Sequence, residues 1–455
     1  MPNITSKNPA TDIDIKTYTL HTDVEVENLL AKANETYHTY KRTELADRIP
    51  LMQKAADLLD ERKNRLAEIM TQEMGKTYAS AQSEVEKCAW VCRYYASHAS
   101  EFLADEIVET DAKKSFISYQ PLGAVLAVMP WNYPLWQVFR FAAPALMAGN
   151  VALLKHASNV PESALQIEKI FRDAGFPEYT FITLLIKSDQ VESILNNPIV
   201  KAATLTGSEK AGGIVSAQAG MKIKKTVLEL GGSDPYIILE DADINLAASE
   251  CVKSRLKNSG QSCIGAKRFI VLEEVYVTFI EKFKHEMESA IVGDPMQAVD
   301  LGPMARKDLR EEVHQQVLDS IKAGATLSLG GHIPEGKGAY YPPTILENVK
   351  PGMPAYDDEI FGPVASVIKV KNEADAIRVA NDTRFGLGAC VFTQDIKRGQ
   401  RIATQEIEAG SCFVNEAVKS DPRLPFGGIK TSGYGRELSS NGIREFVNIK
   451  TVYIQ

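Results

Sequence analysis

The stretch Gly123-Ala-Val-Leu-Ala-Val-Met129 decides the fold, because it is a short, uniformly apolar run that Pro130 closes. Such a run, bounded by turn residues and too short for a helix, predicts a buried β-strand. Three further strands are predicted after it, each followed by a helical pattern. The strands are Val151-Ala-Leu-Leu154, Phe181-Ile-Thr-Leu-Leu-Ile186 and Ala202-Ala-Thr-Leu205, and the helices are 162–174, 189–196 and one beginning near Ser208. This alternation predicts a parallel sheet covered by helices on both faces.

The α/β pattern extends to both sides of this stretch. Residues 24–104 have the apolar periodicity of helices, and a second α/β stretch runs from Gly231 to about residue 430. A chain of 455 residues is long enough for two or three domains. Residues 447–455 have an isolated strand pattern. A lone strand needs a pairing partner, and another subunit is one candidate.

Composition narrows the function classes. The chain has 51 Lys and Arg against 59 Asp and Glu, a net charge of −8, which gives little electrostatic support for binding nucleic acid or anionic membranes. No apolar run approaches the roughly 18 residues of a membrane span, and the N-terminus lacks a signal-peptide profile. We therefore expect a cytoplasmic protein.

Cys88 and Cys92 share one helix face. Packing at a helix interface is a better interpretation of this pair than a metal site, and no metal is predicted.

Motifs of several enzyme classes are missing or broken. The P-loop-like segment 331–337 has Gly338 where Ser or Thr should follow, and Pro342 and Pro343 prevent the required helix. Neither a Gly-x-Gly-x-x-Gly fingerprint nor a Gly-x-Ser-x-Gly elbow occurs. Kinase, NTPase and serine-hydrolase functions lose their best support.

Two reactive side chains stand in unusual contexts. Cys263 lies in Asn258-Ser-Gly-Gln-Ser-Cys-Ile-Gly265, where small and polar neighbours suit a nucleophile, although a buried structural thiol is the alternative. Glu229 lies between two leucines and before Gly231-Gly232, where desolvation should raise its pKa toward that of a general base. A helix-capping or turn carboxylate is the alternative for Glu229.

Two loops have the character of binding sites. Asn132, in Met129-Pro-Trp-Asn-Tyr-Pro134, is held between two prolines, which suits an oxyanion donor as well as an ordinary turn residue. In Leu205-Thr-Gly-Ser-Glu-Lys-Ala-Gly212 a strand passes into a helix, so free N–H groups could bind a phosphate. A simple capped turn fits this second segment equally well.

Together and in this order, the motifs resemble those of the aldehyde dehydrogenase superfamily over nearly the whole chain. The matching segments are Pro130-Trp-Asn-Tyr-Pro134, Glu229-Leu-Gly-Gly232, Gly260-Gln-Ser-Cys263, Glu359-Ile-Phe-Gly-Pro363 and Pro425-Phe-Gly-Gly-Ile-Lys-Thr-Ser-Gly433. The resemblance implies a Rossmann-like α/β cofactor domain (1–102 and 122–231), an α/β catalytic domain (232–430) and a small β oligomerisation element (103–121 and 431–455). It also implies a homodimer or homotetramer.

The resemblance implies a mechanism and a set of roles. Cys263 would attack the aldehyde carbon, Asn132 would stabilise the oxyanion, and Glu229 would activate the water that hydrolyses the thioester. The residues implied to bind NAD or NADP are Trp131, Lys155, Ser158, Gly207, Ser208, Gly212, Leu230, Glu359 and Phe361. Ser158 stands where NAD-preferring relatives often have a glutamate, so NADP is the expected preference.

The substrate is expected to be succinate semialdehyde. Arg140 and Lys257 resemble the basic pair with which succinate-semialdehyde dehydrogenases bind the distal carboxylate, and Ser420 could add a hydroxyl contact. Lys257 departs from the arginine common at its position. The alternatives are an aminoaldehyde or a general aliphatic aldehyde as substrate, and, in another class, an inactive relative with a structural or binding role.

Overall fold

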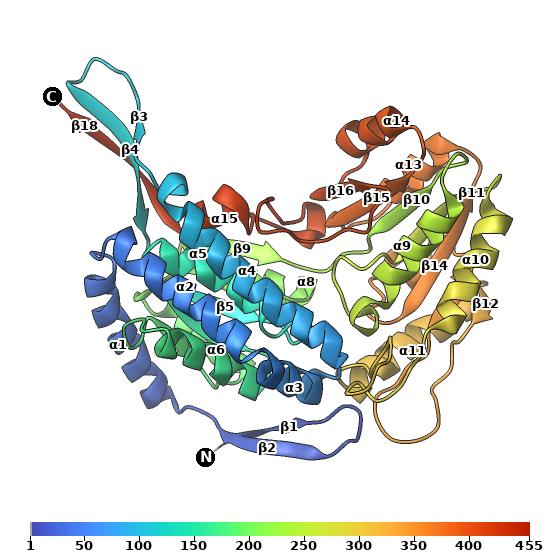
Figure 1. Cartoon of the computed structure of the whole chain (residues 1–455), viewed down its shortest axis with the longest axis horizontal. Coiled ribbons are helices and arrows are strands. Elements are labelled where there is room, and N and C mark those ends of the chain that lie inside the picture. Colours follow the sequence, from blue (N-terminus) through green and yellow to red (C-terminus); the bar gives the residue numbers. More distant parts are fainter. Residues whose placement is uncertain (1) are drawn as a thin grey trace.

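The computed structural model describes residues 2–455, which form two lobes and an arm that projects from the first lobe (Figure 1). The chain opens with an antiparallel hairpin of β1 (Asn3–Lys7) and β2 (Asp14–Thr19). Among the helices of these residues, none is long and apolar enough to cross a membrane.

The first lobe is built on a six-stranded sheet with the order β17-β9-β8-β5-β6-β7. All neighbours are parallel except β17, which runs antiparallel to β9. The strands are β5 (Ala124–Met129), β6 (Val151–His156), β7 (Phe181–Thr183), β8 (Val200–Thr206), β9 (Lys225–Glu229) and β17 (Gly433–Tyr434). The parallel sheet predicted from residues 123–206 is therefore confirmed.

The helices of this lobe begin close to the predicted residues. Pro161 opens α6 at a position where its missing N–H costs nothing, and the Ser208 Oγ caps α8 by accepting from the N–H of Ala211 at 3.3 Å. The helical segments are α1 (Asp23–Tyr40), α2 (Leu45–Glu61), α3 (Lys63–Met74), α4 (Tyr78–Phe102), α5 (Trp136–Met147), α6 (Pro161–Asp173), η1 (Ser188–Gln190), α7 (Val191–Asn196), α8 (Glu209–Met221) and α15 (Ser439–Arg444). Cys88 and Cys92 are fully buried on α4 in the core, as the packing interpretation predicted.

The second lobe holds a seven-stranded sheet with the order β12-β13-β14-β11-β10-β15-β16, in which only β12 is antiparallel to its neighbour. Its strands are β10 (Pro235–Ile238), β11 (Arg268–Leu272), β12 (Thr326–Leu329), β13 (Thr344–Glu347), β14 (Val364–Val370), β15 (Gly388–Phe392) and β16 (Ser411–Val414). Its helical segments are α9 (Ile244–Leu256), η2 (Lys257–Gly260), α10 (Tyr276–Ser289), α11 (Lys307–Lys322), α12 (Pro354–Asp357), α13 (Glu373–Asn381), α14 (Ile396–Arg401), η3 (Ile402–Glu406) and η4 (Lys430–Ser432).

The projecting arm is a three-stranded antiparallel sheet. The C-terminal strand β18 (Val447–Ile454) pairs with β4 (Lys114–Pro121) along its whole length, and β3 (Glu106–Ile107) lies on the other side of β4. The partner of the terminal strand is thus a strand of the same chain. The chain returns to the arm as β18 only after β17 has joined the sheet of the first lobe, where Gly433 pairs with Glu229. The domain limits given above stay predictions.

Candidate active site

Cys263 lies on the second lobe, in the loop between η2 and β11. The backbone just before this loop is left-handed. The φ angles are 56° at Asn258, 55° at Ser259 and 74° at Gly260. A Cβ at position 260 would lie 2.2 Å from the backbone carbonyl carbon of Gly362. Glycine is required here because the Cys263 loop packs directly on the backbone of the Glu359–Pro363 motif.

Lys267 anchors the same loop, and sequence reasoning missed it. Its Nζ donates to the carbonyl oxygens of Ser262 at 2.8 Å and Cys263 at 2.6 Å, and it pairs with Glu359 Oε1 at 3.1 Å. The side chain is 2% exposed. A lysine directly before the buried strand that begins at Arg268 was the available signal, because lysine is almost never fully buried without partners.

The Cys263 thiol is half-buried and mostly protonated in this state. Burial raises the pKa of Cys263 to about 11, although the positive charges of Lys267 and Arg140 oppose the rise. Desolvation disfavours the thiolate more than these two cations stabilise it.

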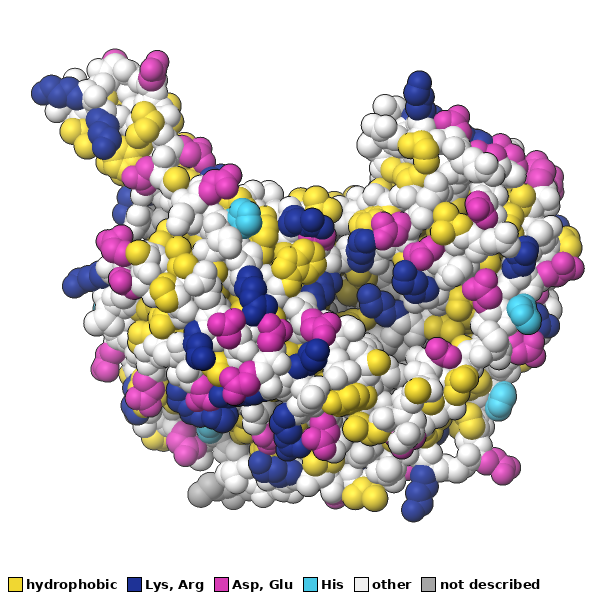
Figure 2. Space-filling model, in the orientation of Figure 1, with side chains coloured by type: hydrophobic (Ala, Val, Ile, Leu, Met, Phe, Trp, Pro, Cys, Tyr) yellow, Lys and Arg dark blue, Asp and Glu magenta, His cyan; other side chains and the backbone are white. Residues whose placement is uncertain are grey.

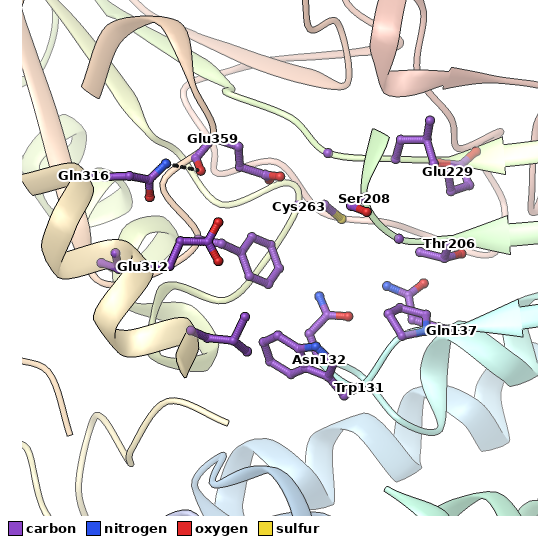
Figure 3. Close-up of a pocket in the computed structure, with 17 residues that line it drawn as sticks. Trp131, Asn132, Gln137, Thr206, Ser208, Glu229, Cys263, Glu312, Gln316 and Glu359 are labelled. Carbon is purple, nitrogen blue, oxygen red and sulfur yellow. Dashed lines mark hydrogen bonds between the residues drawn. The ribbon is translucent and has the colours of Figure 1, made fainter. Parts of the chain in front are cut away.

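The Asn132 loop, on the first lobe, is tied to the Cys263 loop. The Asn132 Nδ2 donates to the carbonyl oxygen of Gln261 at 3.2 Å, and the Asn132 carbonyl accepts from the Nδ2 of Asn258 at 2.8 Å. In Figure 3 the Asn132 side-chain amide points toward the Cys263 sulfur. An Asn side chain has two N–H donors, so one remains for an oxyanion.

A buried ion pair on the first lobe supports the Asn132 loop. Glu84 pairs with Lys76, and its Oε1 accepts from the backbone N–H groups of Leu135 at 2.8 Å and Trp136 at 2.9 Å. This carboxylate therefore caps α5 at the point where the Asn132 loop enters the helix. Lys76 and Glu84 are further residues that sequence reasoning missed.

Glu229 ends β9 and is 2% exposed. Its pKa is raised well above the usual range, first by burial and then by the Glu437 carboxylate, while Arg140 and Arg436 oppose the rise. Neither carboxylate oxygen has a hydrogen-bond partner among the described residues. The raised pKa that the sequence predicted is present, and the free oxygens could accept a proton from water.

A cavity of about 270 Å³ reaches from the first lobe to Cys263 (Figure 3). Its walls include backbone at the β8–α8 junction and an edge-to-face pair of Trp131 and Phe361, whose ring centroids are 5.8 Å apart. Glu359 is held there by the Gly232 N–H at 3.1 Å. The residues of the cofactor prediction that line this cavity are Trp131, Gly207, Ser208, Leu230, Glu359 and Phe361. Free N–H groups, an aromatic wall and a carboxylate fit a dinucleotide.

A second, smaller cavity of about 140 Å³ also reaches Cys263. We call it the narrow cavity and the 270 Å³ cavity the wide cavity. Arg140, Lys257 and Ser420, the three residues of the substrate prediction, all line it. Lys87 of α4 lines it as well, although no sequence pattern indicated this residue. Cys263 and Gln137 line both cavities, so the thiol lies where the two meet.

Comparison with known proteins agrees with this geometry. The model of the aldehyde dehydrogenase family matches residues 2–452. The chain belongs to the aldehyde dehydrogenase family.

Similar proteins include two succinate-semialdehyde dehydrogenases (NADP+). The one from Mycobacterium leprae is 52% identical, with 99% of this chain and 100% of the relative covered, and one from Mycobacterium tuberculosis is 50% identical, with 99% of both covered. A crystal structure of succinic semialdehyde dehydrogenase from Streptococcus pyogenes in complex with NADP+ is 39% identical. It superposes with a TM-score of 0.97 over 99% of both chains.

Three residues of the cofactor prediction lie outside the 270 Å³ cavity of this aldehyde dehydrogenase. Gly212 packs on Leu230, where a Cβ would lie 2.6 Å from the leucine Cδ1, so it acts through Leu230. Lys155 is buried on β6, and burial lowers its pKa. Ser158 is exposed before α6 and lines a separate cavity beside the N-terminal hairpin.

Arg140 has a partner that the sequence did not indicate. Its guanidinium pairs with Glu437 and lies 4.7 Å from the centroid of the Phe426 ring, and both charged side chains are buried. The positive charge of Arg140 in this aldehyde dehydrogenase is therefore largely compensated by Glu437.

Proposed function

We propose that the protein oxidises succinate semialdehyde to succinate with NADP+ as the hydride acceptor. The observation that carries this proposal is the position of Cys263, where a wide cavity suited to a dinucleotide meets a narrow cavity lined with cations. The names of the mycobacterial relatives and the NADP+ complex of the Streptococcus pyogenes protein support the same assignment. An aminoaldehyde is disfavoured, because its ammonium would face Lys87 and Lys257.

The proposed chemistry follows from three side chains. The Cys263 thiol gives up its proton to solvent, the resulting thiolate attacks the aldehyde carbon, and the oxyanion is bound by the Asn132 amide and the Cys263 N–H. After oxidation leaves a thioester on Cys263, Glu229 takes a proton from water, which attacks the thioester carbon and releases the acid. Burial raises the pKa of Glu229, so its carboxylate, when ionised, is a stronger base than that of a solvated glutamate.

The cofactor is proposed to lie in the wide cavity. NADP+, when bound, supplies the acceptor for the hydride of the substrate. The Gly207–Ser208 turn at the start of α8 would bind the pyrophosphate, and Glu359 would bind ribose hydroxyls. Lys155 and Ser158 are proposed to bind the adenosine ribose, where Ser158 adds no negative charge against a 2′-phosphate.

We also propose that the protein is a cytoplasmic homodimer or homotetramer. Its arm exposes large apolar side chains, with Ile107, Ile449 and Tyr453 each more than half exposed. Exposed apolar patches of this kind support association with another subunit. The six cysteines are free thiols, which is consistent with a reducing compartment.

The test is the formation of reduced cofactor with succinate semialdehyde and with butanal, with NADP+ and NAD+ in parallel. We expect kcat/KM at least tenfold higher for succinate semialdehyde and for NADP+, a difference of about 1.4 kcal/mol, and no turnover with Cys263→Ala. A tenfold preference for NAD+ would overturn the cofactor assignment. Turnover of butanal but not of succinate semialdehyde would overturn the substrate assignment.

A further inference from the structure

Lys87 places an ammonium group in the narrow cavity. Its Nζ donates to the Ser420 Oγ at 2.7 Å and lies 4.3 Å from the centroid of the Trp136 ring. Both contacts come from residues that line the cavity leading to Cys263. Figure 2 shows Lys and Arg side chains around a hollow between the two lobes.

Neither Lys87 nor Lys257 has a carboxylate partner, since no ion pair within residues 2–455 includes either of them. The nearby acids are already engaged. Glu84 is bound by Lys76 and by two backbone N–H groups of α5, and Asp421 pairs with Arg423 at 2.6 Å.

Arg140 differs from these two lysines, because Glu437 forms an ion pair with it and compensates its charge. The cavity therefore contains an excess of positive charge that resides on Lys87 and Lys257. A buried or half-buried cation without a counter-ion is costly, so the site favours an anionic ligand.

We propose that Lys87 is the residue that binds the distal carboxylate of the substrate, with Ser420 and Lys257 beside it. Arg140 then acts mainly by holding Glu437 near Glu229. This inference rests on the proposed function, because it assigns the recognition of that substrate to a particular side chain. Lysine suits the role as a compact charge that one carboxylate oxygen can approach.

The charge of Lys87, and with it the binding of a carboxylate, should depend on pH. Burial, together with the positive charges of Lys257 and Arg140, lowers the pKa of Lys87 to about 7, although Cys88 and Asp421 oppose the fall. Glu84 faces the same cavity, and Ser420 and Trp136 are neutral. Lys87 is thus charged below pH 7 and increasingly neutral above it, so recognition of a carboxylate should weaken as the pH rises.

The measurement is the ratio of kcat/KM for succinate semialdehyde to kcat/KM for butanal. Ionisation of Cys263 and Glu229 affects both substrates and cancels in this ratio. With the carboxylate bound only by charged Lys87, the ratio should fall about tenfold between pH 6 and pH 8. The matched variants are Lys87→Met, Lys87→Arg and, as a control of general charge, Lys253→Met on the exposed side of α9.

We expect Lys87→Met to lower the ratio at pH 6 at least tenfold, mainly through KM for succinate semialdehyde. Lys87→Arg should keep a high ratio but lose its dependence on pH, because arginine stays charged. Lys253→Met should leave the ratio within twofold of the unmodified protein. Thermal unfolding of each variant checks that it is folded.

Two different failures can be told apart. If the unmodified protein prefers succinate semialdehyde but Lys87→Met keeps that preference, the assignment to Lys87 is wrong and the proposed function stands. If the unmodified protein has no preference for the carboxylate-bearing aldehyde at pH 6, both the substrate assignment and this inference are wrong.

Discussion

The reactivity of Cys263 toward an alkylating reagent is a direct measure of the electrostatics of its loop. With a pKa of about 11, roughly one Cys263 thiol in a thousand is ionised at pH 8, whereas about a quarter of free cysteine is ionised. The three units between this pKa and pH 8 correspond to about 4 kcal/mol against the thiolate. At equal intrinsic nucleophilicity, Cys263 should therefore react on the order of 200-fold more slowly than free cysteine at pH 8.

The assay is alkylation of the cofactor-free protein with iodoacetamide from pH 7 to pH 9.5. The rate is followed by mass spectrometry of the peptide that contains Cys263, and Cys263→Ala gives the background from the half-buried Cys412. We expect the rate to rise about tenfold for each pH unit without a plateau, because the thiolate fraction does so below the pKa. A plateau with a midpoint at or below pH 9 would refute the claim that burial outweighs Lys267 and Arg140.

Two further variants test the supports of the site. Gly231→Ala places a Cβ 2.4 Å from Glu359 Oε2, so Glu359 must move. KM for NADP+ at saturating aldehyde should then rise about tenfold. An unchanged KM would show that Glu359 is not a cofactor ligand. Glu84→Gln removes the counter-ion of Lys76 and weakens the cap of α5, so Asn132 loses its support. Steady-state kcat should then fall roughly tenfold to a hundredfold, and an unchanged kcat would mean that the Asn132 loop is held without Glu84.

Local sequence patterns predicted the elements around the site well. The apolar runs from Gly123 to Leu205 became the parallel strands of the first lobe, and the three predicted helices began close to their predicted residues. The small and polar neighbours of Cys263 and the leucines around Glu229 also indicated their environments. These features depend on residues near one another in the chain, which periodicity and spacing describe directly.

The missed features depend on contacts between distant residues. Glu437 follows Arg140 by almost 300 positions, and the pairing of β18 with β4 joins equally remote segments. Lys87 lies three residues after Glu84 and directly before Cys88, on the edge of the buried face of α4. That spacing could have flagged it, but a lysine on an amphipathic helix ordinarily extends into solvent. Only the packing of Ser420 over α4 shows that its ammonium faces inward.

The route of the C-terminal segment has a consequence for biosynthesis. After β16 the chain crosses back to the first lobe, where Gly433 pairs with Glu229, and then adds β18 to the arm. Before this segment is made, a nascent chain already contains Cys263 and Glu229, but β9 is an edge strand paired only with β8, and Glu437 has not yet been added. Domains generally fold from the N-terminus during synthesis. A chain truncated before Gly433 would thus carry Cys263 and Glu229 without the strand that pairs with β9 and without Glu437, so this late segment completes the reaction centre.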